Sequence, residues 1–236
     1  MIRSLGICVL AVVAASCSSE GSRAVPPPAS HSEPAAPAAV PADSRASTPF
    51  GRGPRIVVLG DSLTAGLGLA PEQAYPALLQ KRLDAAGLKY EVVNAGVSGD
   101  TSAGGLRRVD WVLEGDVKIL IVALGGNDAL RGLPVEQLRD NLITITDRAK
   151  ARGIKMILAG MEAPPNFGPA YTAAFRQAYR DVARQQGAIL IPFLLDGVAG
   201  LPDMNQGDGI HPTAAGAEKV ADTVWSALRP LVSPND

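Results

Sequence analysis

From residue 55 onward, the chain alternates short apolar runs with longer segments of helical character. The apolar runs are rich in valine, isoleucine and leucine. Most of them lack the in-and-out alternation of a strand with one exposed face, which is typical of strands buried on both faces. We therefore expect five strands, at residues 55–59, 90–94, 117–124, 155–159 and 188–191.

The intervening segments predict helices at residues 75–86, 102–113, 135–152 and 171–186, and a last helix from about 213 to 228. Three of these helices are followed by Gly87, Gly153 and Gly187, and glycine commonly ends a helix. Strands that alternate with helices predict an α/β fold, in which a five-stranded parallel sheet carries helices on both faces.

The N-terminal residues follow a different pattern. Arg3 precedes an apolar run at residues 5–15, which is shorter than the ~20 residues that a membrane-spanning helix needs and is typical of a cleaved signal peptide. The run leads into the sequence VAASC, which resembles a bacterial lipobox and would make Cys17 the lipidated residue. Ordinary signal-peptidase cleavage near Ala15 or Ser16 is the alternative. We expect an exported protein, in the bacterial periplasm or at the outer membrane, that is anchored by lipid.

Residues 18–53 are rich in alanine, proline and serine and show no apolar periodicity. Such a segment buries too little surface to offset the entropy of ordering, and its prolines favour an extended linker. The predicted organisation is a signal peptide at residues 1–17, a disordered tether at 18–53 and one folded domain at 54–236.

Composition narrows the possible chemistry. The chain has 22 basic and 23 acidic residues and only 4% aromatic residues, which argues against a nucleic-acid partner. Both cysteines, Cys8 and Cys17, precede the folded domain, so this domain has neither a disulfide nor a thiol nucleophile. His31 lies in the tether, so His211 is the only histidine of the domain.

Polar clusters follow four of the five predicted strands: GDSL at residues 60–63, NAGVSGD at 94–100, GGND at 125–128 and DGIHP at 208–212. The carboxyl ends of parallel strands meet at one edge of a sheet, where functional groups of α/β proteins collect. We therefore expect these four clusters to lie close together.

The clusters contain the parts of a serine nucleophile system. A serine hydroxyl needs a neighbouring base, and His211 is the available candidate to activate Ser62. Asp208 precedes this histidine by three residues, a spacing that lets its carboxylate orient the imidazole. The backbone N–H groups of Ser62 and Gly99 and the side-chain amide of Asn127 are candidate donors to an oxyanion.

Each of these residues also has an ordinary interpretation. Ser62 could cap a helix, Gly99 could serve a turn, and Asn127 could be a turn residue. The catalytic interpretation is favoured because the only histidine of the domain follows an aspartate by three residues, after the last strand.

Other polar or aromatic residues near these clusters are expected to be structural. Asp61 is expected to shape the turn around Ser62, and Asp128 and Arg131 are expected to be structural. Asp100 or Thr101 is expected to cap the next helix. The two tryptophans, Trp111 and Trp225, are expected to pack in the core.

Taken in order, GDSL at 60–63, Gly99, GND at 126–128 and Asp208-x-x-His211 resemble the four motif blocks of the SGNH (GDSL) hydrolases. The family is named for a serine, glycine, asparagine and histidine, which here are Ser62, Gly99, Asn127 and His211. The resemblance spans about residues 55–231 and looks closest to periplasmic multifunctional acyl-thioesterase, arylesterase and lysophospholipase members. It implies a flavodoxin-like three-layer α/β/α fold, a Ser62–His211–Asp208 triad and an oxyanion hole of Ser62, Gly99 and Asn127.

The expected function is hydrolysis of carboxylic esters through an acyl-enzyme, with thioesters and lysophospholipids as further candidate substrates. The expected partner is a small ester or lipid. We expect no cofactor, metal or nucleic acid, and contact with a membrane only through the lipid anchor. The apolar loop with Met161, Pro165 and Phe167 is expected to form the wall for the acyl chain. A carbohydrate acetyl esterase on the same fold and a non-catalytic envelope lipoprotein are the alternatives.

Overall fold

The computed structural model describes residues 53–233. The expected signal peptide with Cys17 lies outside the described residues, and so does the expected tether up to residue 52. Within the described part, no helix combines the length and apolar character that crossing a membrane requires.

Five parallel strands form one sheet in the order β2-β1-β3-β4-β5. All five predicted strands are confirmed, with each boundary within two residues of the prediction. The strands are β1 (Arg55–Gly60), β2 (Glu91–Gly96), β3 (Val117–Ala123), β4 (Lys155–Ala159) and β5 (Ile189–Ile191).

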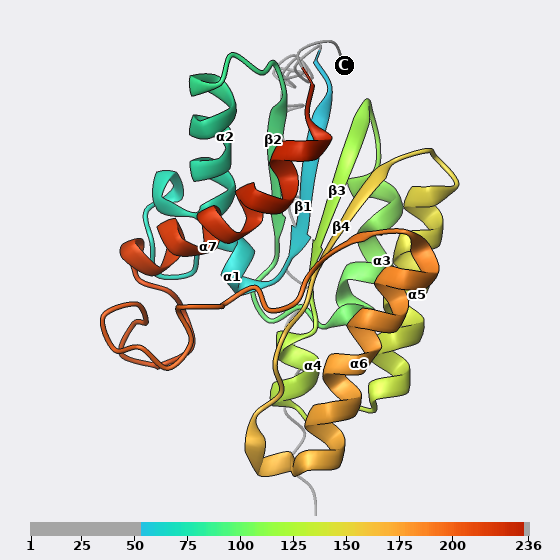
Figure 1. Ribbon diagram of the computed structural model, residues 1–236, viewed down its shortest axis with the longest axis vertical. Helices are drawn as coiled ribbons and strands as arrows, with labels where there is room; N and C mark the ends of the chain where they lie inside the picture. The colour runs from blue at the N-terminus through green and yellow to red at the C-terminus, as the bar shows by residue number, and fades with distance from the viewer. Residues whose placement is uncertain (1–52, 234–236) are drawn as a thin grey trace, which may run out of the picture. The chain divides into compact units, whose positions relative to one another are not determined.

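Helices cover both faces of this sheet, as Figure 1 shows, and give the predicted three layers. One face carries α1 (Ser62–Ala65), α2 (Tyr75–Ala85) and α7 (Ala214–Leu228). The other face carries α3 (Ser102–Val112), α5 (Val135–Lys150) and α6 (Pro169–Gln186). Shorter turns complete the chain: α4 (Gly126–Leu130), η1 (Pro71–Gln73), η2 (Pro165–Phe167) and η3 (Arg229–Leu231).

The core lies between the sheet and the two helical layers. Every residue of the central strand β1 is buried, because helices cover both of its faces, and this explains the absence of alternation in its sequence. The edge strand β2 is mostly half-buried. Gly87, Gly153 and Gly187 follow helices with positive φ angles of 68°, 69° and 69°, as expected of helix-ending glycines.

The expectation that both tryptophans pack in the core is wrong for Trp111, which is 70% exposed. This residue lies on the face of α3 that also carries Arg107 and Asp110, both exposed, so the helical period turns it away from the sheet. Trp225 is partly buried and packs against the core from α7.

Candidate active site

The sequence-predicted site residues all lie in connections that follow strands. Ser62 is the first residue of α1, directly after β1, and Asn127 is the second residue of α4, after β3. Gly99 lies in the loop between β2 and α3, while Asp208 and His211 lie between β5 and α7. The parallel sheet therefore brings residues from four connections to its carboxyl edge, as predicted.

Ser62, His211 and Asp208 form a continuous hydrogen-bonded chain. The imidazole Nε2 of His211 is 2.9 Å from Ser62 Oγ, and its Nδ1 is 2.6 Å from Asp208 Oδ2. The other carboxylate oxygen of Asp208 accepts the backbone N–H groups of Ile210 and His211 at 2.9 and 3.0 Å. The hydrogen bond from the His211 side chain and then these backbone donors hold the pKa of Asp208 well below its usual range.

The loop that carries His211 is fastened by Gln206, a residue that sequence reasoning missed. Its backbone N–H donates to the carbonyl of His211 at 2.7 Å. Its side-chain Nε2 donates to the carbonyls of Pro212, at 2.9 Å, and Leu67, at 2.7 Å. Leu67 follows α1 closely, so this amide ties the histidine loop to the helix that begins at Ser62.

The turn at Ser62 is capped by Asp61, whose side chain accepts the backbone N–H of Leu63 at 3.0 Å. The alternative interpretation of Ser62 as the helix cap is therefore wrong, and the serine hydroxyl is left to face His211. Asp61 is only 3% exposed. Burial raises the pKa of its carboxyl from 3.8 to about 6, although the N–H of Leu63 and the nearby His211 act in the opposite direction.

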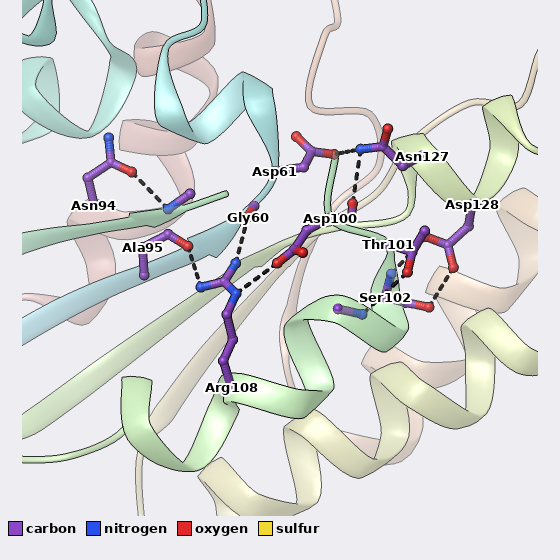
Figure 2. A network of polar contacts seen from close by, with 12 residues as sticks. Gly60, Asp61, Asn94, Ala95, Asp100, Thr101, Ser102, Arg108, Asn127 and Asp128 are labelled. Carbon is purple, nitrogen blue, oxygen red and sulfur yellow. Dashed lines mark hydrogen bonds and ion pairs between the residues drawn. The ribbon is translucent and has the colours of Figure 1, made fainter. Parts of the chain in front are cut away.

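Three candidate oxyanion donors lie in the connections that follow β1, β2 and β3. Within residues 53–233, neither Ser62 N–H nor Gly99 N–H donates a hydrogen bond to another protein group. Gly99 has a left-handed φ of 83°, a conformation that favours glycine. The side-chain amide of Asn127 donates to the backbone carbonyl of Asp100 at 2.9 Å and contacts Asp61 Oδ2 at a longer 3.4 Å, as Figure 2 shows.

A set of polar contacts supports these loops from behind (Figure 2). Thr101 caps α3 through Gly104 N–H, as one of the two predicted candidates. Asp128 accepts the backbone N–H and the hydroxyl of Ser102 at 2.8 and 2.5 Å, which fastens the start of α3 to α4. Arg131 donates to the carbonyl of Gly99 at 3.0 Å. These contacts agree with the structural roles expected for Asp128 and Arg131.

Arg108 is the largest omission of the sequence reasoning at this site. It donates to the Asp100 carboxylate at 2.8 Å and to the carbonyls of Ala95 and Gly60 at 2.7 and 2.8 Å. The sequence does not separate Arg108 from Arg107, because each arginine follows a small residue, Gly104 or Ala103, by four positions.

A cavity of about 440 Å³ opens beside Ser62 and is also lined by His211 and Asn127. Met161 and Pro165 line it, as predicted for the acyl wall, but Phe167 does not. Phe167 packs on Tyr171 instead, with ring centroids 5.3 Å apart. Ala163 and Pro164, from the same predicted loop, also line the cavity, whereas sequence reasoning missed Leu63, Leu130, Phe193, Leu195, Ala199 and Ile210.

The described residues contain no group of three histidine, cysteine, aspartate or glutamate side chains that could hold a metal ion. The site contains a hydroxyl, an imidazole and a carboxylate that are linked by hydrogen bonds, and an apolar cavity lies beside the hydroxyl. This arrangement allows the imidazole to accept the hydroxyl proton while donors stabilise a developing negative charge.

Comparisons with known proteins agree with this geometry. The model of the GDSL-like lipase/acylhydrolase family matches residues 58–219. Esterase TesA of Pseudomonas aeruginosa is 47% identical over 178 residues, which cover 75% of this chain and 89% of that protein. Thioesterase 1/protease 1/lysophospholipase L1 of Escherichia coli K12 is 37% identical over 179 residues, which cover 75% and 85%. A crystal structure of TesA, 47% identical, matches 76% of this chain and 99% of its own with a TM-score of 0.72.

Proposed function

The chain belongs to the GDSL-like lipase/acylhydrolase family, and we propose that it is a serine esterase with Ser62 as nucleophile, His211 as base and Asp208 as the orienting carboxylate. The observation that carries this proposal is the continuous Ser62–His211–Asp208 chain, with distances of 2.9 and 2.6 Å. The relatives named as an esterase and as a thioesterase and lysophospholipase support ester hydrolysis as the reaction class.

In the first half of the reaction, Ser62 Oγ attacks the ester carbonyl carbon while His211 Nε2 takes the hydroxyl proton. The carboxylate of Asp208 accepts Nδ1–H, fixes the tautomer and stabilises the imidazolium that forms. When the tetrahedral intermediate collapses, the bond to the leaving oxygen breaks and His211 gives that oxygen its proton. The products of this half are an alcohol and an acyl-enzyme on Ser62.

In the second half, a water molecule takes the place of the alcohol. His211 accepts a proton from this water as the water attacks the acyl carbon, and returns the proton to Ser62 Oγ when the acyl bond breaks. The products are the free acid and the regenerated hydroxyl.

The oxyanion of both tetrahedral intermediates is assigned to Ser62 N–H, Gly99 N–H and the side-chain amide of Asn127. The two backbone groups make no other hydrogen bond within the described residues, so they are available as donors. The Asn127 amide holds Asp100 O at 2.9 Å but Asp61 at only 3.4 Å. We propose that the amide N–H that contacts Asp61 turns to the oxyanion, because this 3.4 Å contact is the weaker of the two.

The substrate is assigned from the cavity beside Ser62, whose walls are mainly apolar. An acyl chain placed there would be removed from water, while the ester carbonyl lies at the nucleophile. The name of the Escherichia coli relative adds acyl thioesters and lysophospholipids as candidates. Residues 1–17, with the lipobox-like sequence at Cys17, support export and lipid anchoring.

The nucleophile is tested with Ser62→Ala and a matched control, Ser226→Ala, on the exposed side of α7. We expect the first variant to keep its fold by circular dichroism but to lose turnover of p-nitrophenyl butyrate and labelling by a fluorophosphonate. The control should keep both. Normal turnover in Ser62→Ala would refute the proposal, and so would activity confined to acetylated sugars, which would favour a carbohydrate esterase.

The acyl site is tested with p-nitrophenyl esters of increasing chain length. Ala163 is buried in the cavity wall, so Ala163→Phe should shorten the longest acyl chain that is accepted while sparing the acetate ester. Phe167 does not line the cavity, so Phe167→Ala serves as the control. If both variants keep the chain-length preference of the parent protein, the acyl chain does not occupy this cavity.

The anchor is tested with Cys17→Ser in cells. The change removes the thiol that a lipid would modify, so the protein should move from the membrane to the soluble fraction. A variant that fractionates like the parent protein would remove the lipoprotein proposal and leave the esterase proposal intact.

A further inference from the structure

Arg108 joins three segments that converge behind the nucleophile, and we infer that it is the positioning residue of the oxyanion hole. This inference rests on the proposed function, because the oxyanion hole is part of that proposal. Among the residues that the structure describes, Arg108 makes no hydrogen bond with Ser62 and acts through other residues. Arg108 lies on α3, and its guanidinium contacts the ends of β1 and β2 and the loop that follows β2 (Figure 2).

Each nitrogen of the guanidinium has its own acceptor. Nε donates to the Asp100 carboxylate at 2.8 Å, Nη1 to Ala95 O at 2.7 Å and Nη2 to Gly60 O at 2.8 Å. The side chains of Arg108 and Asp100 are only 18% and 16% exposed, so water screens their charges weakly. Hydrogen bonds between charged groups are about twice as strong as those between neutral groups.

Asp100 connects this arginine to the proposed oxyanion donors. Its carboxylate is held by Arg108, while its backbone carbonyl accepts the side-chain amide of Asn127 at 2.9 Å. Asp100 is therefore fixed from two sides, and its position determines where the Asn127 amide can point. The same guanidinium holds Gly60, which lies two residues before Ser62. Arg108 therefore fixes the backbone near Ser62 as well as the Asp100 carbonyl that Asn127 contacts.

Gly99 depends on the same arrangement. It has no side chain of its own to fix it, it is exposed, and it adopts a φ of 83°. Its carbonyl is held by Arg131, which is itself exposed, and exposed contacts of this kind contribute little. Gly99 is bonded directly to Asp100, so the part-buried Arg108–Asp100 pair holds the backbone on the C-terminal side of Gly99.

The test compares Arg108→Lys with Arg107→Lys, the same change at the exposed neighbouring position. Lysine keeps the charge but cannot satisfy three separate acceptors. Losing one oxyanion donor outright costs about a hundredfold to a thousandfold in turnover, so misplacing donors should lower kcat by about 10- to 100-fold. The KM for p-nitrophenyl butyrate should change by less than about threefold, because ground-state contacts are preserved. Arg107→Lys should match the parent protein.

A double-mutant cycle separates positioning from a general structural effect. In an Asn127→Ala background the amide that Arg108 positions is already gone, so Arg108→Lys should then cost much less than it does alone. Equal costs in both backgrounds would overturn the inference, and so would an unchanged kcat in Arg108→Lys. If Arg108→Lys does not fold, Asp100→Asn carries the same cycle, since it removes the charge and keeps the backbone carbonyl. Normal turnover in Ser62→Ala would instead refute the proposed function.

Discussion

Asp61 should make the protein less stable as the pH rises, and Asp61→Asn should remove that effect. Its folded-state pKa of about 6 lies above the ordinary 3.8, so the native state holds a proton more tightly than the unfolded state does. The stabilisation is complete below about pH 4 and is lost as the pH rises past 6. At about 1.4 kcal/mol per pKa unit, the whole change amounts to about 3 kcal/mol. Asparagine can still cap α1, but it does not titrate.

The measurement is urea unfolding of both proteins, followed by circular dichroism at several pH values. The difference in unfolding free energy cancels the contributions of the other ionisable groups that the two proteins share. Between about pH 4.5 and pH 7.5, the unfolding free energy of the parent protein should fall by about 2 kcal/mol relative to that of Asp61→Asn. Parallel pH curves for the two proteins would refute the argument, because they would show that the buried carboxyl does not titrate abnormally.

Three further results are expected. Asp208→Asn should lower kcat by about 10³- to 10⁴-fold with an unchanged fold, because the imidazole loses its orienting acceptor; a loss below about tenfold would contradict its place in the triad. Gln206→Ala should lower kcat and leave α7 folded, as checked by circular dichroism, and unchanged kinetics would show that the histidine loop needs no tie to Leu67. Gly125→Ala should lower the free energy of unfolding in urea by at least about 2 kcal/mol, because its Cβ would lie 1.9 Å from the Tyr179 hydroxyl and its φ is 114°. The Cβ of Gly87→Ala would meet no atom within 4 Å, so this change should cost only about 1 kcal/mol. Equal costs at the two glycines would contradict the packing argument.

The sequence predicts the sheet well because burial on both faces leaves a plain signature, a continuous run of branched apolar residues. The longer helices are also predicted, since each repeats its apolar face over several turns. The short helices α1 and α4 are not predicted, because a helix of about one turn has no period to detect. Both carry proposed site residues, so the sequence identified Ser62 and Asn127 without the turns that hold them.

The residues around the proposed catalytic groups were harder to predict. Arg107 and Arg108 are adjacent and chemically identical, yet Arg107 is exposed while Arg108 is half-buried and reaches three acceptors. Only the rotation of α3 relative to the sheet distinguishes them. The cavity poses the same difficulty, because Phe193 and Phe167 come from different connections and only the first reaches the wall. Such contacts depend on how separate segments meet in space.

The separation of Ser62 from His211 has a consequence for the life of the chain before it is folded. Asp208 and His211 are three residues apart and belong to one loop, but Ser62, the proposed nucleophile, is 149 residues from His211 and next to the first strand. In the proposed mechanism, a nascent or truncated chain that ends before residue 208 carries Ser62 without the base that would activate it. On this proposal, ester cleavage begins only when the two ends of the domain have met, and labelling by a fluorophosphonate would report that folding is complete.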